Sequence, residues 1–265
     1  MIIGISLAGR KKIIIANWKM NPVEPEMAKR LYTSTRQTAL GLNRVQVIVA
    51  PPNIFLGILA GNRASKSKKF ALAAQDAHAE LSGAYTGEVS QAMVKNFGVE
   101  YLIIGHSERR KAGEENLLIN KKIKSALKLN FKIILCVGEW TRDHNGNYLK
   151  MIEEQLLTAF KGVAKLEMKN VLIAYEPVWA IGAQAVENDT PEDFLEQALF
   201  IRKILNNIFG KEIAMSAPIL YGGSVDASNA EGFLTAGEAS GLLVGRVSLV
   251  ATEFIKILKI ADGAR

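Results

Sequence analysis

The feature that most constrains the fold of this chain is a repeated alternation of short apolar runs with longer segments of helical periodicity. The apolar runs are rich in β-branched residues and are bounded by turn residues, as strands are. Eight such runs occur, at residues 13–15, 45–49, 70–74, 101–104, 132–137, 171–175, 219–221 and 242–244. Helical spacing is clearest at 25–40, 116–127, 148–160, 191–208 and 249–260. The order is strand then helix, repeated, which predicts an α/β fold.

Eight strand–helix units can close into a (β/α)8 barrel, and the length of the chain suits one such barrel. Its 265 residues are close to the roughly 250 that are typical of this fold. No low-complexity linker or shift in composition divides the chain, so residues 1–265 are predicted to form a single barrel domain. An open, doubly wound sheet would show the same local pattern, but no Gly-x-Gly-x-x-Gly fingerprint follows the first strand.

Charge and cysteine content narrow the classes of function. The formal net charge is +7, but lysines and arginines are spread among acidic residues, and neither a basic stripe nor a set of stacking aromatics indicates nucleic-acid binding. The one cysteine, Cys136, excludes an internal disulfide and a cysteine metal cluster, which favours a reducing compartment such as the cytoplasm. No apolar run is long enough for a membrane span, and no secretion signal is recognisable at the start.

Polar residues that directly follow the apolar runs are the candidates for chemistry. In a closed barrel the ends of all parallel strands meet at one rim, so residues far apart in sequence converge there. Asn17 and Lys19 follow the first run, and because side chains alternate along an extended chain they are expected to face the same way. His106 follows the fourth run and Glu176 follows the sixth. The sequence thus predicts an amide, an ammonium, an imidazole and a carboxylate in one mouth.

The imidazole and the carboxylate suit a proton-transfer reaction. A helix that starts near Ser107 disfavours the charged form of His106, which leaves a neutral donor able to polarise a carbonyl. Glu176 is joined directly to a loop at 177–182, whose closure is expected to desolvate the carboxylate and raise its basicity. Removal of a proton next to a carbonyl requires such a base. The neighbouring Glu108 is expected to brace the site.

Two glycine-containing turns predict a phosphate site on the same rim. Tyr-Gly-Gly-Ser at 221–224 follows the seventh run, and Leu-Val-Gly-Arg at 243–246 follows the eighth. Such turns present backbone N–H groups, and these two positions of a barrel commonly bind phosphate. The implied ligand is a phosphate ester.

Four motifs of this chain resemble those of triosephosphate isomerases. They are Asn-Trp-Lys-Met-Asn at 17–21, Gly-His-Ser-Glu-Arg-Arg at 105–110, Tyr-Glu-Pro-Val-Trp-Ala-Ile-Gly at 175–182 and Tyr-Gly-Gly-Ser-Val at 221–225. The resemblance covers nearly the whole chain. It implies a TIM barrel that interconverts dihydroxyacetone phosphate and glyceraldehyde 3-phosphate, a reaction of glycolysis and gluconeogenesis, without a metal or an organic cofactor. Residues 82–88 also resemble the protruding third loop of the family, which implies a homodimer with Gln75 and Tyr85-Thr86 near the partner's site.

The resemblance assigns a role to each site residue. Glu176 moves a proton between neighbouring carbons, and His106 polarises the carbonyl and shuttles protons between the two oxygens. Lys19 stabilises the developing enediolate, with Asn17 orienting it. The supporting residues are Ser107 and Glu108. The groups that hold the phosphate are Gly182, Ser224, Gly245 and the backbone of Arg246.

Two departures from the family pattern lie on the phosphate side. Where the family commonly continues with Thr-Gly-Lys-Thr, this chain has Ala183-Gln184-Ala185, and Arg246 stands where the family has a second glycine. These departures leave open a related isomerase of four-carbon erythrulose phosphates. A non-catalytic barrel that binds a sugar phosphate is a second alternative. An aldolase that forms a Schiff base on Lys19 is a third.

Overall fold

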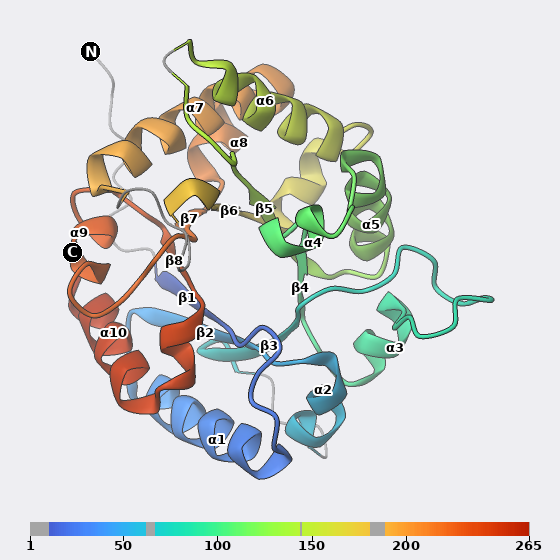
Figure 1. Ribbon diagram of the computed structural model, residues 1–265, viewed down its shortest axis with the longest axis vertical. Coiled ribbons are helices and arrows are strands. Elements are labelled where there is room, and N and C mark those ends of the chain that lie inside the picture. Colours follow the sequence, from blue (N-terminus) through green and yellow to red (C-terminus); the bar gives the residue numbers. More distant parts are fainter. Residues whose placement is uncertain (1–10, 62–66, 144, 181–188, 265) are drawn as a thin grey trace.

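The computed structural model describes residues 11–61, 67–143, 145–180 and 189–264, and within these ranges eight strands close into a parallel barrel. Each strand pairs with the next in sequence, and the last pairs with the first. The strands are β1 (Lys12–Asn17), β2 (Val45–Ala50), β3 (Phe70–Ala74), β4 (Tyr101–Ile104), β5 (Lys132–Val137), β6 (Val171–Tyr175), β7 (Ile219–Tyr221) and β8 (Gly241–Val244). Figure 1 shows this ring of strands with the helices around it. The (β/α)8 barrel predicted from the sequence is confirmed, and the open sheet is wrong.

The helices form the outer layer. They are α1 (Pro25–Gly41), α2 (Asn53–Ala60), α3 (Gln91–Asn96), α4 (Ser107–Lys111), α5 (Asn116–Lys128), α6 (Asn147–Ala159), α7 (Pro191–Phe209), α8 (Lys211–Ser216), α9 (Ala230–Leu234) and α10 (Ala251–Gly263), with 3-10 turns η1 (Lys165–Asn170), η2 (Val178–Ala180) and η3 (Arg246–Leu249). Among the described residues, no helix is long and apolar enough to cross a membrane.

The last predicted helix begins later than the sequence indicates. A helix was expected from residue 249, but η3 comes first and α10 starts at Ala251. The cause is Ser248, whose backbone N–H and hydroxyl both donate to the carbonyl of Gly245, at 2.9 and 2.7 Å. These two bonds close a tight turn directly after β8, so the chain at the rim is held in place before the helix starts.

The start of α7 shows why other boundaries can be predicted well. The hydroxyl of Thr190 accepts a hydrogen bond from the backbone N–H of Asp193 at 3.1 Å, and Pro191 occupies the first helical turn. Glu192 and Asp193 place acidic groups near the positive end of the helix dipole. All of these signals lie within a few residues of one another, so the sequence alone contains them.

Alternate residues of each strand fill two separate layers of the core. Inside the barrel lie Ile15, Ile48, Ile103, Ile134 and Ala174, whereas Ile14, Val47, Leu102, Ile133 and Ile173 pack between the strands and the helices. The period of two places Asn17 in the inward row after Ile15, and Glu176 in the inward row after Ala174. The packing of the strands therefore aims both polar side chains into the mouth of the barrel.

Candidate active site

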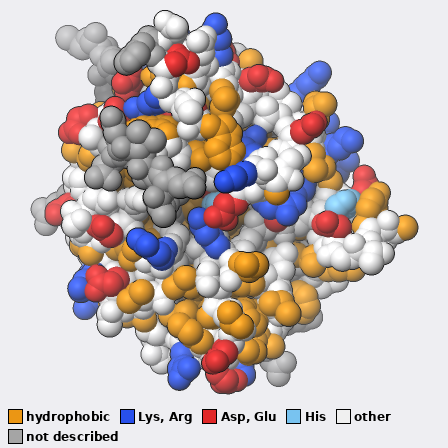
Figure 2. All heavy atoms as spheres, in the orientation of Figure 1, with side chains coloured by type: hydrophobic (Ala, Val, Ile, Leu, Met, Phe, Trp, Pro, Cys, Tyr) orange, Lys and Arg blue, Asp and Glu red, His pale blue; other side chains and the backbone are white. Residues whose placement is uncertain are grey.

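A cavity of about 350 Å³ gathers the residues that the sequence predicts at the rim. It is lined by Asn17, Lys19, His106, Ser107, Glu176, Gly222, Gly223, Ser224, Leu243, Gly245 and Arg246. Figure 2 shows acidic and basic side chains side by side at the centre of this face of the molecule. Gly182 was predicted to bind the phosphate, and Ala183-Gln184-Ala185 differ from the family pattern. Both lie outside the described residues.

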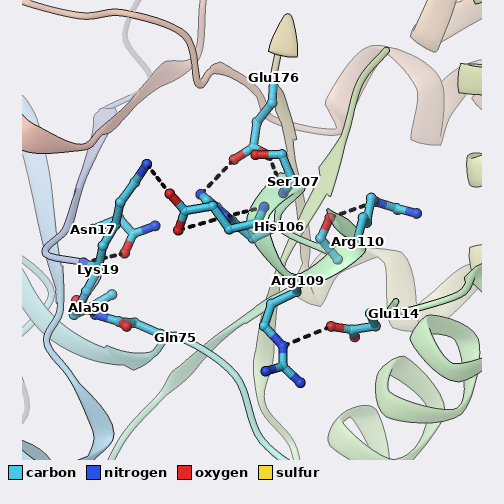
Figure 3. Close-up of polar contacts among 12 residues, drawn as sticks. Asn17, Lys19, Ala50, Gln75, His106, Ser107, Arg109, Arg110, Glu114 and Glu176 are labelled. Atoms are coloured by element: carbon cyan, nitrogen blue, oxygen red, sulfur yellow. Dashed lines mark hydrogen bonds and ion pairs between the residues drawn. The ribbon is translucent and has the colours of Figure 1, made fainter. Parts of the chain in front are cut away.

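Glu176 is buried at the floor of this cavity, with only 2% of its surface exposed. Its Oε2 accepts a hydrogen bond from the backbone N–H of Ser107 at 2.8 Å, and its Oε1 lies 3.2 Å from Nε2 of His106. Figure 3 shows both contacts. The position depends on Gly138 at the end of β5, where a Cβ would lie 1.8 Å from the carbonyl oxygen of Glu176. The carboxylate is therefore shielded from water and held by two donors.

His106 is oriented by the helix that follows it. It caps α4, and its Nδ1 accepts a hydrogen bond from the backbone N–H of Glu108 at 3.2 Å. An imidazole nitrogen that accepts a hydrogen bond carries no proton, so this contact assigns the neutral ring with its proton on Nε2. That nitrogen faces Glu176 across the cavity. The arrangement supports a neutral donor at this position.

Lys19 reaches the cavity through a turn, which corrects the expectation of an extended chain. The strand β1 ends at Asn17, and Lys19 adopts the left-handed backbone conformation with φ of 52°. Its backbone N–H donates to Oδ1 of Asn17 at 3.1 Å, which closes the turn. The Nζ of Lys19 then pairs with Oε1 of Glu108 at 2.8 Å. Asn17 and Lys19 both line the cavity, but only Asn17 is placed there by strand alternation, whereas Lys19 is placed by the turn.

Gln75 holds this turn in place, a contact that sequence reasoning missed. Its Nε2 donates to the backbone carbonyls of Lys19 and Ala50, at 2.7 and 2.8 Å. Non-glycine residues rarely adopt positive φ, and such conformations persist where surrounding contacts enforce them. Gln75 directly follows β3, so the reasoning that selected His106 and Glu176 could also have selected it. The place of Gln75 near the partner's site, which the family resemblance implies, stays a prediction.

The phosphate side of the cavity is formed by the turns after β7 and β8. Ser224 and Arg246 are exposed there, and the carbonyl of Ser224 is held by Nδ2 of Asn229 at 2.8 Å. At Gly245 an added Cβ would lie 3.5 Å from Cε of Lys19, an ordinary van der Waals contact, so the lysine side chain runs alongside this turn. Together with these turns, two cationic residues, Lys19 and Arg246, line the cavity.

Cys136 lies behind the site, where its thiol interacts with the carboxylate of Glu176. The side chain is fully buried inside the barrel, and this burial raises the pKa of the thiol well above its usual value. A thiol with a raised pKa stays protonated near neutral pH and is a poor nucleophile. Cys136 therefore packs in the core of the barrel.

Comparison with known proteins shows similarity over almost the whole chain. A family model described as triosephosphate isomerase matches residues 12–261. The triosephosphate isomerase of Alkaliphilus oremlandii is 40% identical over 254 residues, which cover 94% of this chain and 99% of the relative. That of Chloroherpeton thalassium is 41% identical over 255 residues, covering 96% of this chain and 100% of the relative. That of Carboxydothermus hydrogenoformans is 41% identical over 254 residues, with 94% and 98% covered.

Proposed function

The chain belongs to the triosephosphate isomerase family, and from that premise we propose that Glu176, His106 and Lys19 carry its reaction. The protein is an aldose–ketose isomerase that interconverts dihydroxyacetone phosphate and glyceraldehyde 3-phosphate. One observation carries the choice of residues. The buried carboxylate of Glu176 meets Nε2 of His106 at 3.2 Å, in a cavity bordered by Lys19 and both glycine-containing turns.

In the proposed mechanism the two side chains act on opposite sides of the substrate's carbonyl unit. Glu176 removes a proton from the carbon next to the carbonyl, and the resulting acid returns it to the neighbouring carbon. His106 donates a hydrogen bond from Nε2 to the carbonyl oxygen, where negative charge develops as the enediolate forms. It then protonates this oxygen and takes the hydroxyl proton from the neighbouring oxygen, which becomes the carbonyl oxygen of the product. The ammonium of Lys19 stabilises the same charge, and Asn17 fixes the turn that carries it. Groups of this chain supply each step.

We place the phosphate of the substrate against the turns after β7 and β8. The proposed groups are Ser224, Gly245 and the backbone of Arg246, together with Gly182 outside the described residues. The exposed side chain of Arg246 adds a positive charge beside this position, which favours an anionic ligand. Holding the phosphate fixes the reacting carbons relative to Glu176 and His106, and such positioning is a major source of rate acceleration.

The test of this function is turnover of dihydroxyacetone phosphate by the purified chain in D2O. We expect glyceraldehyde 3-phosphate that carries deuterium on its second carbon, because the proton held by Glu176 exchanges with solvent before it is returned. Mass spectrometry of the product measures this incorporation. An erythrulose phosphate serves as the comparison substrate and should react more slowly. Negligible turnover of the triose phosphate, whatever the result with the tetrose, would contradict the proposal.

We further propose that the protein acts as a homodimer, built on the face that carries the loop between β3 and α3. This loop projects from the barrel in Figure 1. Its Tyr85 packs against His78, with ring centroids 4.2 Å apart, yet remains 46% exposed. Gln75, which directly follows β3, donates to the backbone carbonyl of Lys19. In the segment just after Lys19, Met20 and Val23 are 89% and 87% exposed. Large apolar side chains with this much exposure suit an interface, and a second copy of the chain would cover them.

Sedimentation velocity tests the dimer. The expected mass is about twice the 28.9 kDa of the chain, and Met20→Arg is expected to reduce it to that of a single chain, because the new charge would be buried in the interface. The matched control is Leu166→Arg, since Leu166 is 82% exposed on η1, and this variant should keep the larger mass. A wild-type mass of one chain at micromolar concentration would rule out the stable dimer.

A cytoplasmic location also stays a prediction.

A further inference from the structure

A polar cluster centred on Arg142 lies behind Glu176, outside the cavity. The guanidinium donates from Nε to Oε1 of Glu139 at 3.1 Å, from Nη2 to the hydroxyl of Tyr175 at 3.1 Å, and from Nη1 to Oδ1 of Asp193 at 3.2 Å. It also stacks on the indole of Trp179, 4.6 Å from the ring centroid. One side chain thus connects four others from separate parts of the chain.

Two of these partners flank the catalytic base in sequence. Tyr175 directly precedes Glu176, and Trp179 follows it by three residues in η2. Both aromatic side chains also donate to Oε1 of Glu139, Tyr175 at 2.7 Å and Trp179 at 2.9 Å. Glu139 has no exposed surface, so its carboxylate is a fixed acceptor at the end of β5. The segment that carries Glu176 is therefore fastened on both sides of it.

The contacts of Tyr175 with Arg142 and Glu139 affect the orientation of Glu176 through the backbone that joins the two residues. Tyr175 packs in the outer layer between strands and helices, while Glu176 faces inward. Adjacent strand residues point to opposite faces and share one peptide plane, so fixing the ring of Tyr175 limits rotation of the next residue. The backbone N–H of Glu176 donates to the carbonyl of Val137 at 2.8 Å, which secures the strand end from the other side.

The same guanidinium reaches the start of α7. Besides Asp193, the carboxylate of Asp189 lies 3.9 Å from Nη2 of Arg142. Burial raises the pKa of Asp189 to about 7, and the nearby Arg142 opposes that rise. Among the described residues, Arg142 is the ion-pair partner of all three carboxylates, Glu139, Asp189 and Asp193. Without it, buried negative charge would be left uncompensated beside the segment that holds the base.

We propose that Arg142 is a positioning residue for Glu176, acting through Tyr175, Trp179 and Glu139 rather than through contact with substrate. This inference rests on the proposed function, since Glu176 is the base there. A planar guanidinium can bridge three acceptors and stack on an aromatic ring at once, whereas an ammonium cannot. The role is therefore specific to arginine at this position.

The experiment compares Arg142→Met with the wild type in steady-state turnover of triose phosphate. We expect kcat to fall about 10- to 100-fold, because a base displaced by about 1 Å loses a rate factor of this order. The inhibition constant of inorganic phosphate should change less than about twofold, because Arg142 does not line the cavity and its hydrogen bonds go to Glu139, Tyr175 and Asp193. Arg142→Lys should recover only a minor part of the lost kcat.

Arg202→Met is the matched control. Arg202 is also a partly buried arginine, and it donates to the carbonyls of Ala214 and Ala217 at the end of α8, away from the cavity lining. Its loss should lower stability without lowering kcat when both variants are assayed well below their melting temperatures. A second readout is Trp179→Phe, alone and combined with Arg142→Met. The double variant should lose little more kcat than Arg142→Met, since both changes release the same segment.

The outcomes separate the inference from the proposed function. A kcat of Arg142→Met within twofold of the wild type overturns the inference, as does an equal loss in Arg202→Met or an equal loss of phosphate affinity. If Arg142→Met does not fold, Arg142→Lys is judged by the same three criteria. A wild-type chain without any triose phosphate turnover contradicts the proposed function itself, before any variant is compared.

Discussion

Replacement of Glu176 by glutamine is expected to lower kcat for triose phosphate about a thousandfold, the range that a positioned general base contributes. The amide keeps an oxygen that can accept from the backbone N–H of Ser107, as the carboxylate does at 2.8 Å, but it cannot take up a proton from carbon. The variant should remain folded, because the side chain changes neither its volume nor its place in the inward row. Steady-state kinetics and circular dichroism of the same preparation measure both effects.

Two further variants locate this effect at the carboxylate. Glu176→Asp keeps the charge but withdraws it by about one carbon–carbon bond, so we expect a loss of about a hundredfold. Glu153→Gln makes the same chemical change at an exposed position of α6 and should leave kcat unaltered. Retention of wild-type kcat in Glu176→Gln would show that another group is the base.

Replacement of Lys19 by methionine is expected to lower kcat/KM by about 100- to 1000-fold, the effect of losing one preorganised charge at a developing oxyanion. Methionine nearly preserves the length of the side chain beside Gly245 and does not alter the contact of Gln75 with the backbone of residue 19. It removes only the ammonium that pairs with Glu108 at 2.8 Å. The loss should therefore be electrostatic. Measuring kcat and KM separately, at several salt concentrations, would show how much of the loss lies in kcat and how much in KM.

A matched pair elsewhere on the surface provides the control for Lys19. Lys29 pairs with Glu26 at 2.6 Å on α1, and Lys29→Met should leave kcat/KM within about twofold. Loss of Lys19 also leaves the carboxylate of Glu108 without this partner near the cavity, where it would repel an anionic substrate. Lys19→Met combined with Glu108→Gln removes that repulsion, so it should recover part of KM but little of kcat. Equal activity of Lys19→Met and Lys29→Met would be incompatible with the proposed role.

The Arg142 cluster and the Lys19 turn show two ways in which this barrel prepares its site. At Glu176 the strand alternation already aims the carboxylate inward, and neighbouring groups limit how far it can move. At Lys19 the strand has ended, and the left-handed turn is held by Gln75 from β3. In both cases a residue that does not touch the substrate is expected to determine where a reacting group lies.

Local signals in the sequence determined the architecture of this protein. Apolar runs with β-branched residues and the helix start at Thr190–Asp193 are each contained within a few neighbouring residues, so the strand order and the approximate bounds of the five longest helices could be predicted. The rule that parallel strand ends share one rim was then enough to predict that Asn17, His106 and Glu176 lie in one cavity.

Only the tertiary structure decided how those groups are held. Gln75 meets Lys19 across 56 residues of sequence, Glu108 meets Lys19 across 89, and Arg142 meets Asp193 across 51. Such contacts depend on the register and closure of the barrel, which bring strand-end loops together in three dimensions, and no local periodicity encodes them. The sequence by itself therefore determined which chemical groups reach the mouth, whereas strand packing decided their orientation and their partners.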